Sequence, residues 1–482
     1  MQSFWPPLLF LMFYSTVVGF AQTNFSPSEQ QLLRQLEEKA PHYNAVAQQI
    51  WTWAELGYQE EKSSALLQEE LAKAGFKIEQ GVADIPTAFV ASYGSGSPVI
   101  GVLGEFDALP GVSQAAVPYP LARENAPNGH ACGHHLFGTA SVAAAIAVKD
   151  WLKDSGQAGT IRFYGTPAEE GGAGKVYMTR AGLFADVDAV LHWHPGDGNS
   201  ADPGSTLANM SAKFRFYGKA SHAAAAPERG RSALDGVEAM NYMVNMMREH
   251  VSEKTRIHYV ITRGGEAPNV VPAFAEAFYY VRHPDRAEVK QLFQRLVKAA
   301  EGAAIGTATR MEYEIIHGSY NLLPNKTLAE IMYASLQRVG GVSYNKEEQA
   351  FADSIWQTLG RPEVPLAQAI EVAPFTAEPS VYPASTDVGD VSWVTPTTGL
   401  RTATWVPGTS AHSWQAVACG GTSIGHKGML VAAKTISLTA MQLFLNPDLC
   451  EQAKQELTQR TGKDFKYESL LGDREPPLDY RE

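Results

Sequence analysis

Three segments decide the fold class: VIGVL (residues 99–103), LFGTASVAAAIAVKDWLK (136–153) and TIRFYG (160–165). The two short apolar runs have the length of buried strands, and the long alanine-rich run has the length of a helix. A further run, Val187–Trp193, again has strand length. Strands that alternate with helices along a chain predict an α/β fold, here with a mixed, mostly parallel sheet flanked by helices.

Toward the N-terminus, apolar spacing and cap patterns predict helices over residues 27–40, 43–56 and 62–75. Before them, Phe4–Phe20 is almost entirely apolar, and Gly19-Phe20-Ala21 is a small-x-small cleavage pattern. These features predict a signal peptide over residues 1–21 and an exported protein, periplasmic or secreted. The alternative is an uncleaved N-terminal anchor, with the protein facing outside the cytoplasm.

The pattern changes near residue 207, where half-buried strands begin to alternate with two helices. This arrangement predicts a small inserted α+β domain of ferredoxin-like type. The charged, proline-rich tail from residue 473 is expected at the surface. We expect strands at 211–217, 256–263, 273–282 and 310–316 with helices at 232–250 and 286–301, then helices at 326–339 and 428–444 with strands near 388–395 and 400–406. The predicted domains are a signal peptide (1–21), the first part of a larger domain (22–207), the insert (208–318) and the second part of the larger domain (319–482).

The composition is that of an ordinary globular chain, with 482 residues of which 45% are hydrophobic and 19% charged. The formal charge is −12, from 39 basic and 51 acidic residues. This balance argues against a nucleic-acid or anionic-membrane partner, because either would need a basic face. Three cysteines, Cys132, Cys419 and Cys450, do not make a disulfide framework, although a Cys419–Cys450 bridge stays open in an exported chain.

Metal-binding side chains are concentrated in five short segments. Four of the five follow a predicted strand or lie at its end, and in open α/β sheets ligands bind at that edge. Imidazole, carboxylate and thiolate groups together suit Zn²⁺ or a similar first-row ion, which can polarise a carbonyl and acidify a water. The segments are Gly104–Asp107 (GEFD), His130–His134 (HACGH), Pro167–Glu170 (PAEE), His192–Pro195 (HWHP) and Gly408–Ser413 (GTSAHS).

Taken singly, these residues also have ordinary structural interpretations. Cys132 and His134 are two apart, so on an extended backbone both would point the same way, but a buried cysteine beside unrelated histidines fits equally. The pair Glu169-Glu170 is typical of a solvated turn. In a functional pair, one carboxylate would bind metal and the other would take a proton from the metal-bound water.

Spacing does not choose the ligand between His192 and His194, which flank Trp193 at a strand end. A single histidine on a loop, such as His412, is more often a surface residue than a ligand. The G-x-S-x-G pattern at residues 421–425 would make Ser423 a nucleophile only after a buried strand, and no clear one is predicted there.

Taken together and in this order, the motifs resemble the dinuclear-metal aminoacylase and carboxypeptidase family of metallohydrolases. The branch is that of the N-acyl amino acid amidohydrolases, in which a cysteine replaces the usual bridging aspartate. The resemblance covers nearly all of the chain after residue 21, and it implies a zinc-peptidase-like domain whose insert is a lid or dimerisation domain. It rests on GEFDALPG (104–111), HACGHHLFGTA (130–140), PAEEGGAGK (167–175), LANMSAKFRFYGKASHAA (207–224), STDVGDVSWVTP (385–396) and PGTSAHSW (407–414).

The resemblance assigns roles that the residues alone leave open. It implies two divalent metal ions, Zn or Mn, in each subunit, and a homodimer or a heterodimer with a related subunit. The implied metal ligands are Cys132, His134, Glu170, His194 and His412; Glu169 is the general acid/base; His222 stabilises the oxyanion, often across a dimer; Asn269 and Arg282 hold the substrate carboxylate; and Asp107 orients a ligand. Without the resemblance, Arg282 would be interpreted as a surface charge at a strand edge.

The implied activity is that of a metal-dependent amidohydrolase acting on a linear amide. Its substrate would be an N-acyl or N-aroyl amino acid of the p-aminobenzoyl-glutamate type. Three alternatives remain: an exported metallo-dipeptidase or carboxypeptidase with the same site, a metal-dependent binding protein without catalysis, and a serine hydrolase that uses Ser423. In the leading interpretation the ligand is a small molecule, with no nucleic acid and no membrane as partner after signal cleavage.

Overall fold

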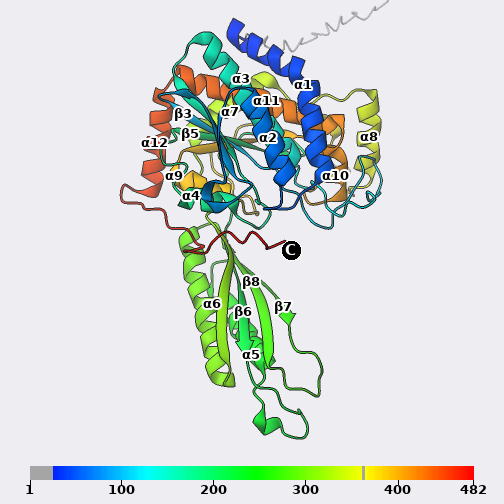
Figure 1. Cartoon of the computed structure of the whole chain (residues 1–482), viewed down its shortest axis with the longest axis vertical. Helices are drawn as coiled ribbons and strands as arrows, with labels where there is room; N and C mark the ends of the chain where they lie inside the picture. Colours follow the sequence, from blue (N-terminus) through cyan, green and yellow to red (C-terminus); the bar gives the residue numbers. More distant parts are fainter. Residues whose placement is uncertain (1–24, 361–363, 482) are drawn as a thin grey trace, which may run out of the picture.

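The computed structural model describes residues 25–360 and 364–481, so the predicted signal peptide lies outside the described residues. The described chain forms a larger α/β part and an elongated part that projects from it (Figure 1). The strands are β1 (Lys77–Gln80), β2 (Phe89–Ser95), β3 (Val99–Gly104), β4 (Gly159–Gly165), β5 (Ala189–Gly196), β6 (Ala208–Tyr217), β7 (Arg256–Arg263), β8 (Phe274–His283), β9 (Arg310–Ser319) and β10 (Thr397–Ala403). The helices are α1 (Pro27–Trp53), α2 (Glu61–Lys73), α3 (His134–Ser155), α4 (Gly174–Arg180), α5 (Ala233–Met247), α6 (Arg286–Thr307), α7 (Lys326–Val339), α8 (Lys346–Gln357), α9 (Val388–Val394), α10 (Trp414–Gly420), α11 (Ser423–Leu445) and α12 (Asp448–Thr461).

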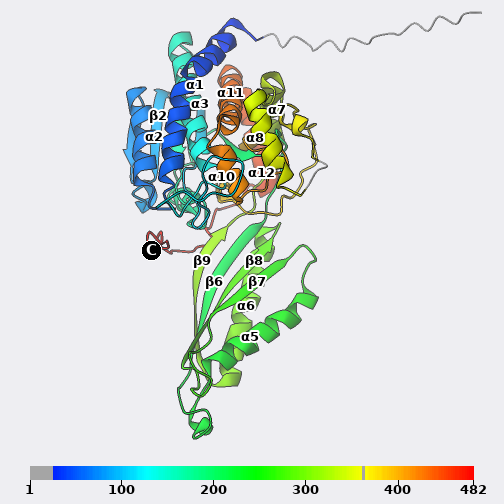
Figure 2. The ribbon, with the colours of Figure 1, turned by 90° about the vertical axis from the view of Figure 1, so that its right-hand side faces the viewer.

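The larger part is built on a six-stranded sheet with the order β1-β2-β4-β3-β5-β10. The central pairs β4–β3, β3–β5 and β5–β10 are parallel, whereas β1 and β2 are attached antiparallel at one edge. Helices lie on both sides of this sheet (Figure 2). The predicted α/β class, with a mixed and mostly parallel sheet flanked by helices, is therefore confirmed. Because the central strands are parallel, the segments that follow β3, β4, β5 and β10 meet at one edge.

The alanine-rich helix α3 is buried along nearly its whole length, because small side chains let α1 and α11 pack closely against it. Among the described helices, α11 alone is long and apolar enough by composition to cross a membrane. However, 78% of that apolar stretch is buried inside the fold, so α11 is accounted for as a core helix.

The projecting part is a four-stranded antiparallel sheet with the order β7-β8-β6-β9. Side chains alternate along its strands: Phe214 and Phe216 on β6 are fully buried in the core with α5 and α6, while Lys213 and Arg215 are only half-buried. The helices cover one face of the sheet (Figure 2). The helices leave the other face open, and the end of that face nearest the larger part lines a cavity.

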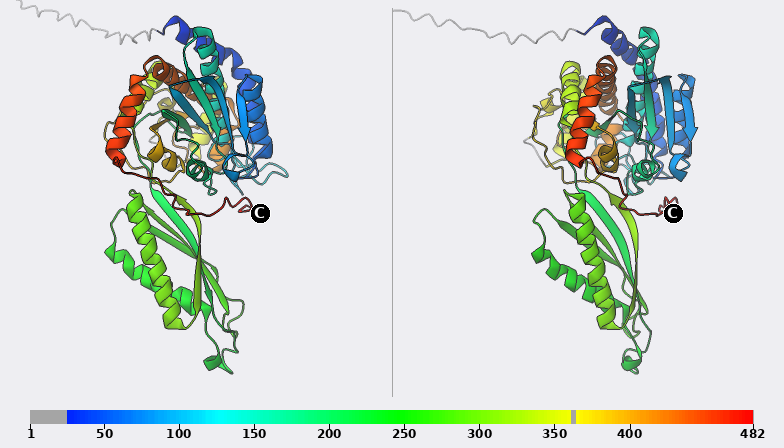
Figure 3. Two further views of the ribbon diagram at one scale, coloured as in Figure 1. Left: turned by 60° about the vertical axis from the view of Figure 1, so that its left-hand side comes forward. Right: turned by 90° about the vertical axis from the view of Figure 1, so that its left-hand side faces the viewer.

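Two local expectations were wrong. Residues 27–53 form one helix that continues through Pro41, because the apolar stripe on either side of Pro41 packs on the same neighbours. Residues 388–394 form helix α9 and not a strand: Val388 and Val391 are buried at helical spacing, which a short apolar run does not distinguish from a strand. Residues beyond 473 are all exposed or half-buried, as expected, and they run along the junction of the two parts (Figure 3). All three cysteines are free, and Cys419 and Cys450 belong to different core clusters.

Candidate active site

Cys132 and His134 are placed by a tight turn into the start of α3. Gly133 between them has φ +79°, and a Cβ at this position would lie 2.7 Å from the side chain of Pro195. Glycine is therefore required here for conformational and steric reasons. The prediction of an extended backbone for this pair was wrong, but the turn still directs both side chains toward the end of β5.

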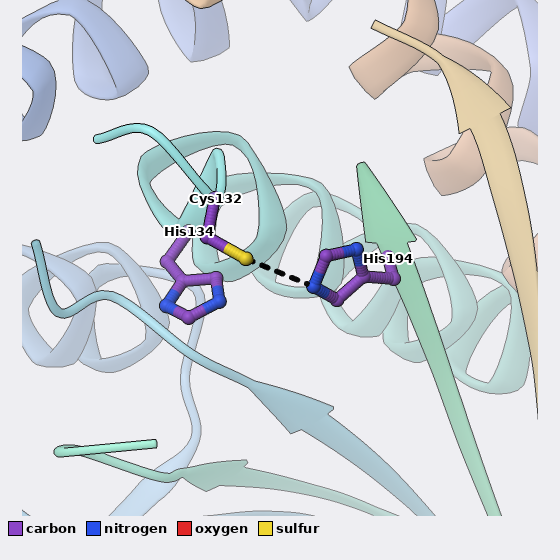
Figure 4. Close-up of side chains that lie close together, drawn as sticks. All are labelled: Cys132, His134 and His194. Atoms are coloured by element: carbon purple, nitrogen blue, oxygen red, sulfur yellow. Dashed lines mark hydrogen bonds between the residues drawn. The ribbon is translucent and has the colours of Figure 1, made fainter. Parts of the chain in front are cut away.

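The first metal-binding group consists of Cys132, His134 and His194, whose ligand atoms all lie within 4.8 Å of one another (Figure 4). Sγ of Cys132 lies 3.3 Å from Nε2 of His194. Nδ1 of His194 lies 2.7 Å from the carbonyl oxygen of Pro195, so Nδ1–H donates to it and Nε2 keeps its lone pair directed at the cluster. His192, two residues earlier, belongs to no such group among the described residues and packs against Gly399 of β10.

The second group shares Cys132 and adds Glu170 and His412. Nε2 of His412 lies 3.1 Å from Oε1 of Glu170. His412 has φ +61°, a conformation that non-glycine residues adopt rarely, and its backbone N–H donates to the carbonyl oxygen of Ala131 at 2.9 Å. Such strain is concentrated at functional sites. Cys132 therefore belongs to both groups, and each group contains two further residues that can bind a metal ion.

The loop that carries Glu169 and Glu170 is held from several directions. Ala168 has φ +57°, and its N–H donates to Oε1 of the buried Glu60 at 2.8 Å. The N–H of Glu170 donates to Oδ2 of Asp107 at 2.8 Å. Oδ1 of Asp107 also accepts from Nδ1 of His134 at 2.8 Å. Asp107 therefore fixes a histidine ring and the carboxylate loop at the same time, as the outer ligands of metal sites commonly do.

Charge is unevenly distributed over the cluster. The negative charges of Cys132, Asp107 and Glu105 outweigh burial and raise the pKa of His134 well above its usual value. The proximity of Cys132 and Glu170 raises the pKa of His412 to about 10. Both histidines are thus favoured as cations, which means that the cluster stabilises positive charge at its centre.

Glu169 lies in a different environment from Glu170. Burial, together with the charges of Glu105, Glu170 and Asp387, raises the pKa of Glu169 well above its usual value. A carboxyl group with a raised pKa holds a proton more readily than an ordinary glutamate does, which suits a group that both accepts and returns a proton.

The donor atoms fit metal ions. Nε2 of His134 and Oε1 of Glu170 are buried, and although they lie 3.1 Å from Oε2 of Glu105 and Nε2 of His412, neither contact has hydrogen-bond geometry within residues 25–360 and 364–481. Buried polar atoms are normally satisfied, so orphaned donors around one point indicate a missing cation. Thiolate, imidazole and carboxylate together are the ligands of zinc and related first-row ions.

A cavity of about 750 Å³ opens on this cluster. Glu169, Glu170 and His412 line it from the larger part, and Arg282 lines it from the uncovered face of the projecting sheet. Nε of Arg282 is buried without an acceptor, and the guanidinium lies 5.3 Å from the ring centroid of Tyr280. The strand period explains this placement, because Arg282 alternates with the core residue Val281.

His222 and Asn269 are not part of this cavity. The N–H of Ala223 donates to the carbonyl oxygen of Asn269 at 2.9 Å, so the two residues are neighbours, and both side chains are exposed. They lie beyond the ends of β6 and β7 that point away from the larger part (Figure 1). Within one chain, the structure brings together every predicted site residue except these two.

Several residues near the cluster had no predicted role. Glu105, Lys175 and Asp387 form a buried ion-pair network under Glu169, and each lies in one of the motifs quoted above. Tyr480 and Arg481 reach the cavity from the C-terminal segment, for which the sequence offers no signal. Ser423, the first residue of α11, donates its hydroxyl to Glu348 of α8 and does not line the cavity, so it is not a nucleophile candidate. His135 points away from the cluster, with Nε2 3.0 Å from the carbonyl oxygen of Gly420.

Known proteins share the sequence pattern and the fold of this chain. Residues 101–372 match the model of peptidase family M20/M25/M40. The chain is 45% identical to the B subunit of p-aminobenzoyl-glutamate hydrolase of Escherichia coli, over 88% of this chain and 94% of that protein. It is 29% identical to Xaa-Arg dipeptidase of Mus musculus, over 89% and 93% of the two chains. A dinuclear metal binding peptidase of the M20 family from Bacillus subtilis has the same fold, with a TM-score of 0.58 and 16% identity over 86% of this chain and 99% of that chain.

Proposed function

The chain belongs to peptidase family M20/M25/M40, and from that membership we propose that it hydrolyses the amide bond of an N-aroyl amino acid of the p-aminobenzoyl-glutamate type. Its family and its hydrolase relatives make it a metal-dependent enzyme that acts on linear amides. The observation that carries the substrate proposal is the 45% identity to the Escherichia coli p-aminobenzoyl-glutamate hydrolase protein over nearly the whole chain.

Two divalent ions would be held by the two groups that share Cys132. His134 and His194 would complete the ligands of one ion, and Glu170 and His412 those of the other. The thiolate and imidazole ligands favour Zn²⁺, while carboxylate ligands also suit Mn²⁺. Metal ions at this position would polarise the scissile carbonyl and acidify a water molecule.

Glu169 would move the protons of the reaction. It lies on the cavity wall beside Glu170, and its raised pKa suits a group that first takes a proton from water and then gives it to the leaving nitrogen. Asp107 would keep the ring of His134 in one orientation throughout. Arg282 would hold the carboxylate of the substrate, because a guanidinium group binds a carboxylate through two parallel hydrogen bonds.

His222 would act in the active site of a second chain. His222 is exposed and does not line the cavity of its own chain. It would therefore reach the cavity of another copy or of a related subunit, and the equivalent histidine of that partner would enter the cavity of this chain. Exposed apolar side chains on the projecting part support such an assembly: Tyr242 and Met246 on α5 and Val260 on the edge strand β7 are 69%, 51% and 57% exposed. The Escherichia coli relative is by its name one of the subunits of a hydrolase, which leaves a related subunit as the other candidate partner.

The deciding experiment is hydrolysis of p-aminobenzoyl-glutamate by the purified protein with Zn²⁺ or Mn²⁺, and again after a chelator. We expect metal-dependent release of p-aminobenzoate. No release from a protein that binds two metal ions would reject this substrate and leave the metallohydrolase; no release and no bound metal would reject the site assignment.

A dipeptidase is the second candidate, favoured by the 29% identity to an Xaa-Arg dipeptidase over most of both chains. A panel of dipeptides, tested beside aroyl-glutamates under the same metal conditions, separates the two. Higher kcat/KM for dipeptides would favour this second function.

We also propose that the protein is exported, because Phe4–Phe20 and the pattern Gly19-Phe20-Ala21 are typical of a signal peptide. N-terminal sequencing of protein from cell fractions tests this directly. A mature chain that begins at residue 22 outside the cytoplasm is expected, and an intact N-terminus in the cytoplasm would reject export.

A further inference from the structure

The C-terminal segment forms one wall of the active-site cavity. After α12 it runs along the junction between the larger and the projecting part (Figures 1 and 3). Its residues Asp479, Tyr480 and Arg481 line the cavity. Its path is fixed by packing: the hydroxyl of Tyr467 donates to Oδ1 of Asp390 at 2.6 Å, and Leu470 and Leu471 are buried in two different core clusters. Further on, Arg474 donates to the carbonyl oxygen of Ile316 at 2.9 Å.

Tyr480 and Arg481 lie directly against the loop that carries Glu170. The hydroxyl of Tyr480 donates to the carbonyl oxygen of Glu170 at 3.2 Å, and its ring packs edge-on against Tyr58 with centroids 5.6 Å apart. Nη2 of Arg481 donates to the same carbonyl oxygen, and its guanidinium lies 4.7 Å from the ring centroid of Tyr480. The guanidinium group is therefore held on the cavity wall beside a proposed metal ligand.

Several charged groups that line the cavity have a partner of opposite charge. Among the lining arginines, Arg282 and Arg481 differ from Arg474: within the described residues neither contacts a carboxylate, and Nε of each is buried without an acceptor. An enclosed guanidinium group without an anion indicates that an anion is bound there in the working enzyme. The paired lining groups are Arg474 with Glu314 at 3.2 Å, Asp387 with Lys175 at 2.6 Å and Glu170 with His412 at 3.1 Å.

We propose that Arg481 binds a second carboxylate of the substrate, so that the enzyme selects N-acylated amino acids whose side chain is also acidic. This inference rests on the proposed function, in which Arg282 binds the first carboxylate. Two guanidinium groups from separate walls, the projecting sheet and the C-terminal segment, match two anionic groups on one small molecule. A substrate with a neutral side chain would leave Arg481 without its anion.

Lys213 offers a matched control. It also lines the cavity and makes no ion pair within the described residues. However, it lies four residues along β6 from Asn209, which is the strand partner of Arg282. That separation is about 13 Å along the strand, so Lys213 lines a different stretch of the cavity wall from Arg282.

The test compares p-aminobenzoyl-glutamate with p-aminobenzoyl-glutamine, which has the same shape but a neutral side chain. We expect the wild type to prefer the glutamate compound. Arg481→Gln should lower kcat/KM for the glutamate compound by roughly 10- to 100-fold, mainly through KM, and should change the glutamine compound only a few-fold. Arg481→Lys should keep part of the preference, and Lys213→Gln and Tyr480→Phe should keep all of it.

Three results would overturn the proposal: an unchanged preference in Arg481→Gln, an equal loss for both compounds, or a preference that is lost in Lys213→Gln instead. An equal loss would mean that Arg481 acts only by holding Glu170. If the wild type cleaves neither compound, the proposed function fails, and Arg481 is then tested by binding. Glutarate, but not butyrate, should raise the Tm of the wild type more than that of Arg481→Gln, and equal shifts would reject the role.

Discussion

Nζ of Lys175 lies 2.6 Å from Oδ1 of Asp387, a residue 212 positions later in the chain, and neither side chain has any exposed surface. Glu105 is the third member of this network, at 2.8 Å from the same ammonium group. Oε2 of Glu105 in turn lies 3.1 Å from Nε2 of His134. The two sequence halves of the larger part are thus joined by buried charges directly beneath the metal-binding groups.

Replacement of Lys175 by Met should destabilise the fold strongly. It leaves Glu105 and Asp387 buried without their cation, and loss of one partner in a buried pair costs about 3–5 kcal/mol. Urea unfolding measures the change in free energy. Lys39→Met is the control, because Lys39 is 48% exposed in its pair with Asp150 and should contribute below about 1 kcal/mol. Equal effects of the two substitutions would contradict the importance of the buried network.

Glu169→Gln should retain metal and lose turnover. The amide cannot take up a proton from water, so kcat should fall by roughly 10²- to 10⁴-fold if Glu169 is the general base. Glu170→Gln should instead lower the metal content, which elemental analysis measures beside kcat. A Glu169→Gln protein with near wild-type kcat would exclude the role.

Cys132→Ala should weaken the binding of both metal ions, because its Sγ belongs to both donor groups. His194→Ala should weaken only one of them. Equilibrium dialysis with Zn²⁺ gives the stoichiometry of each variant. Cys450→Ala, a buried cysteine far along the chain in α12, is the control and should bind metal as the wild type does. Loss of a single ion in Cys132→Ala would contradict a shared ligand.

The stability of the protein should fall as pH rises toward 7 because of Asp390. Burial raises the pKa of this carboxyl to about 7, so the folded state favours its protonated form. The stabilisation is complete below the ordinary pKa of aspartate and is lost as pH rises through the raised value. Relative to Asp390→Asn, the wild type should lose on the order of 4 kcal/mol between pH 4 and pH 8. A difference in unfolding free energy that does not change with pH would rule this out.

A mixture of two inactive variants should recover activity if His222 acts across subunits. In a dimer of Glu169→Gln with His222→Asn, one active site still has both Glu169 and a partner chain's intact histidine. Random pairing of homodimers should give about a quarter of the wild-type activity after subunit exchange. Mixing that restores nothing, from chains shown to exchange subunits, would reject the action of His222 across subunits.

Much of the site could be predicted from local patterns. The runs at 99–103, 136–153 and 160–165 have lengths and compositions that few other structures accommodate, and they became β3, α3 and β4. Metal-capable residues after successive strands were expected at one sheet edge, because parallel strands end together. For the same reason Asp107, Glu170 and His194 could be placed at one sheet edge before any contact was known, whereas Cys132 directly follows no strand.

Other features depended on contacts between distant segments. The helix at 388–394 and the continuation of α1 through Pro41 are decided by the neighbours on which their apolar residues pack, and not by propensity. The partners of Lys175 lie 70 residues before it and 212 after it, and no local pattern specifies that pairing.

The amino-acid pattern alone therefore predicted the α/β class, the insert and the chemistry of the donor residues, because these follow from periodicity and side-chain type. Folding in three dimensions established the rest. In the folded chain, the left-handed turn at Gly133 places Cys132 in both donor groups. His222 lies away from the cavity of its own chain, and Arg481 contacts the loop of Glu170. Each of these features depends on how segments far apart in the chain are placed relative to one another, and that placement is fixed by the packing of the whole molecule.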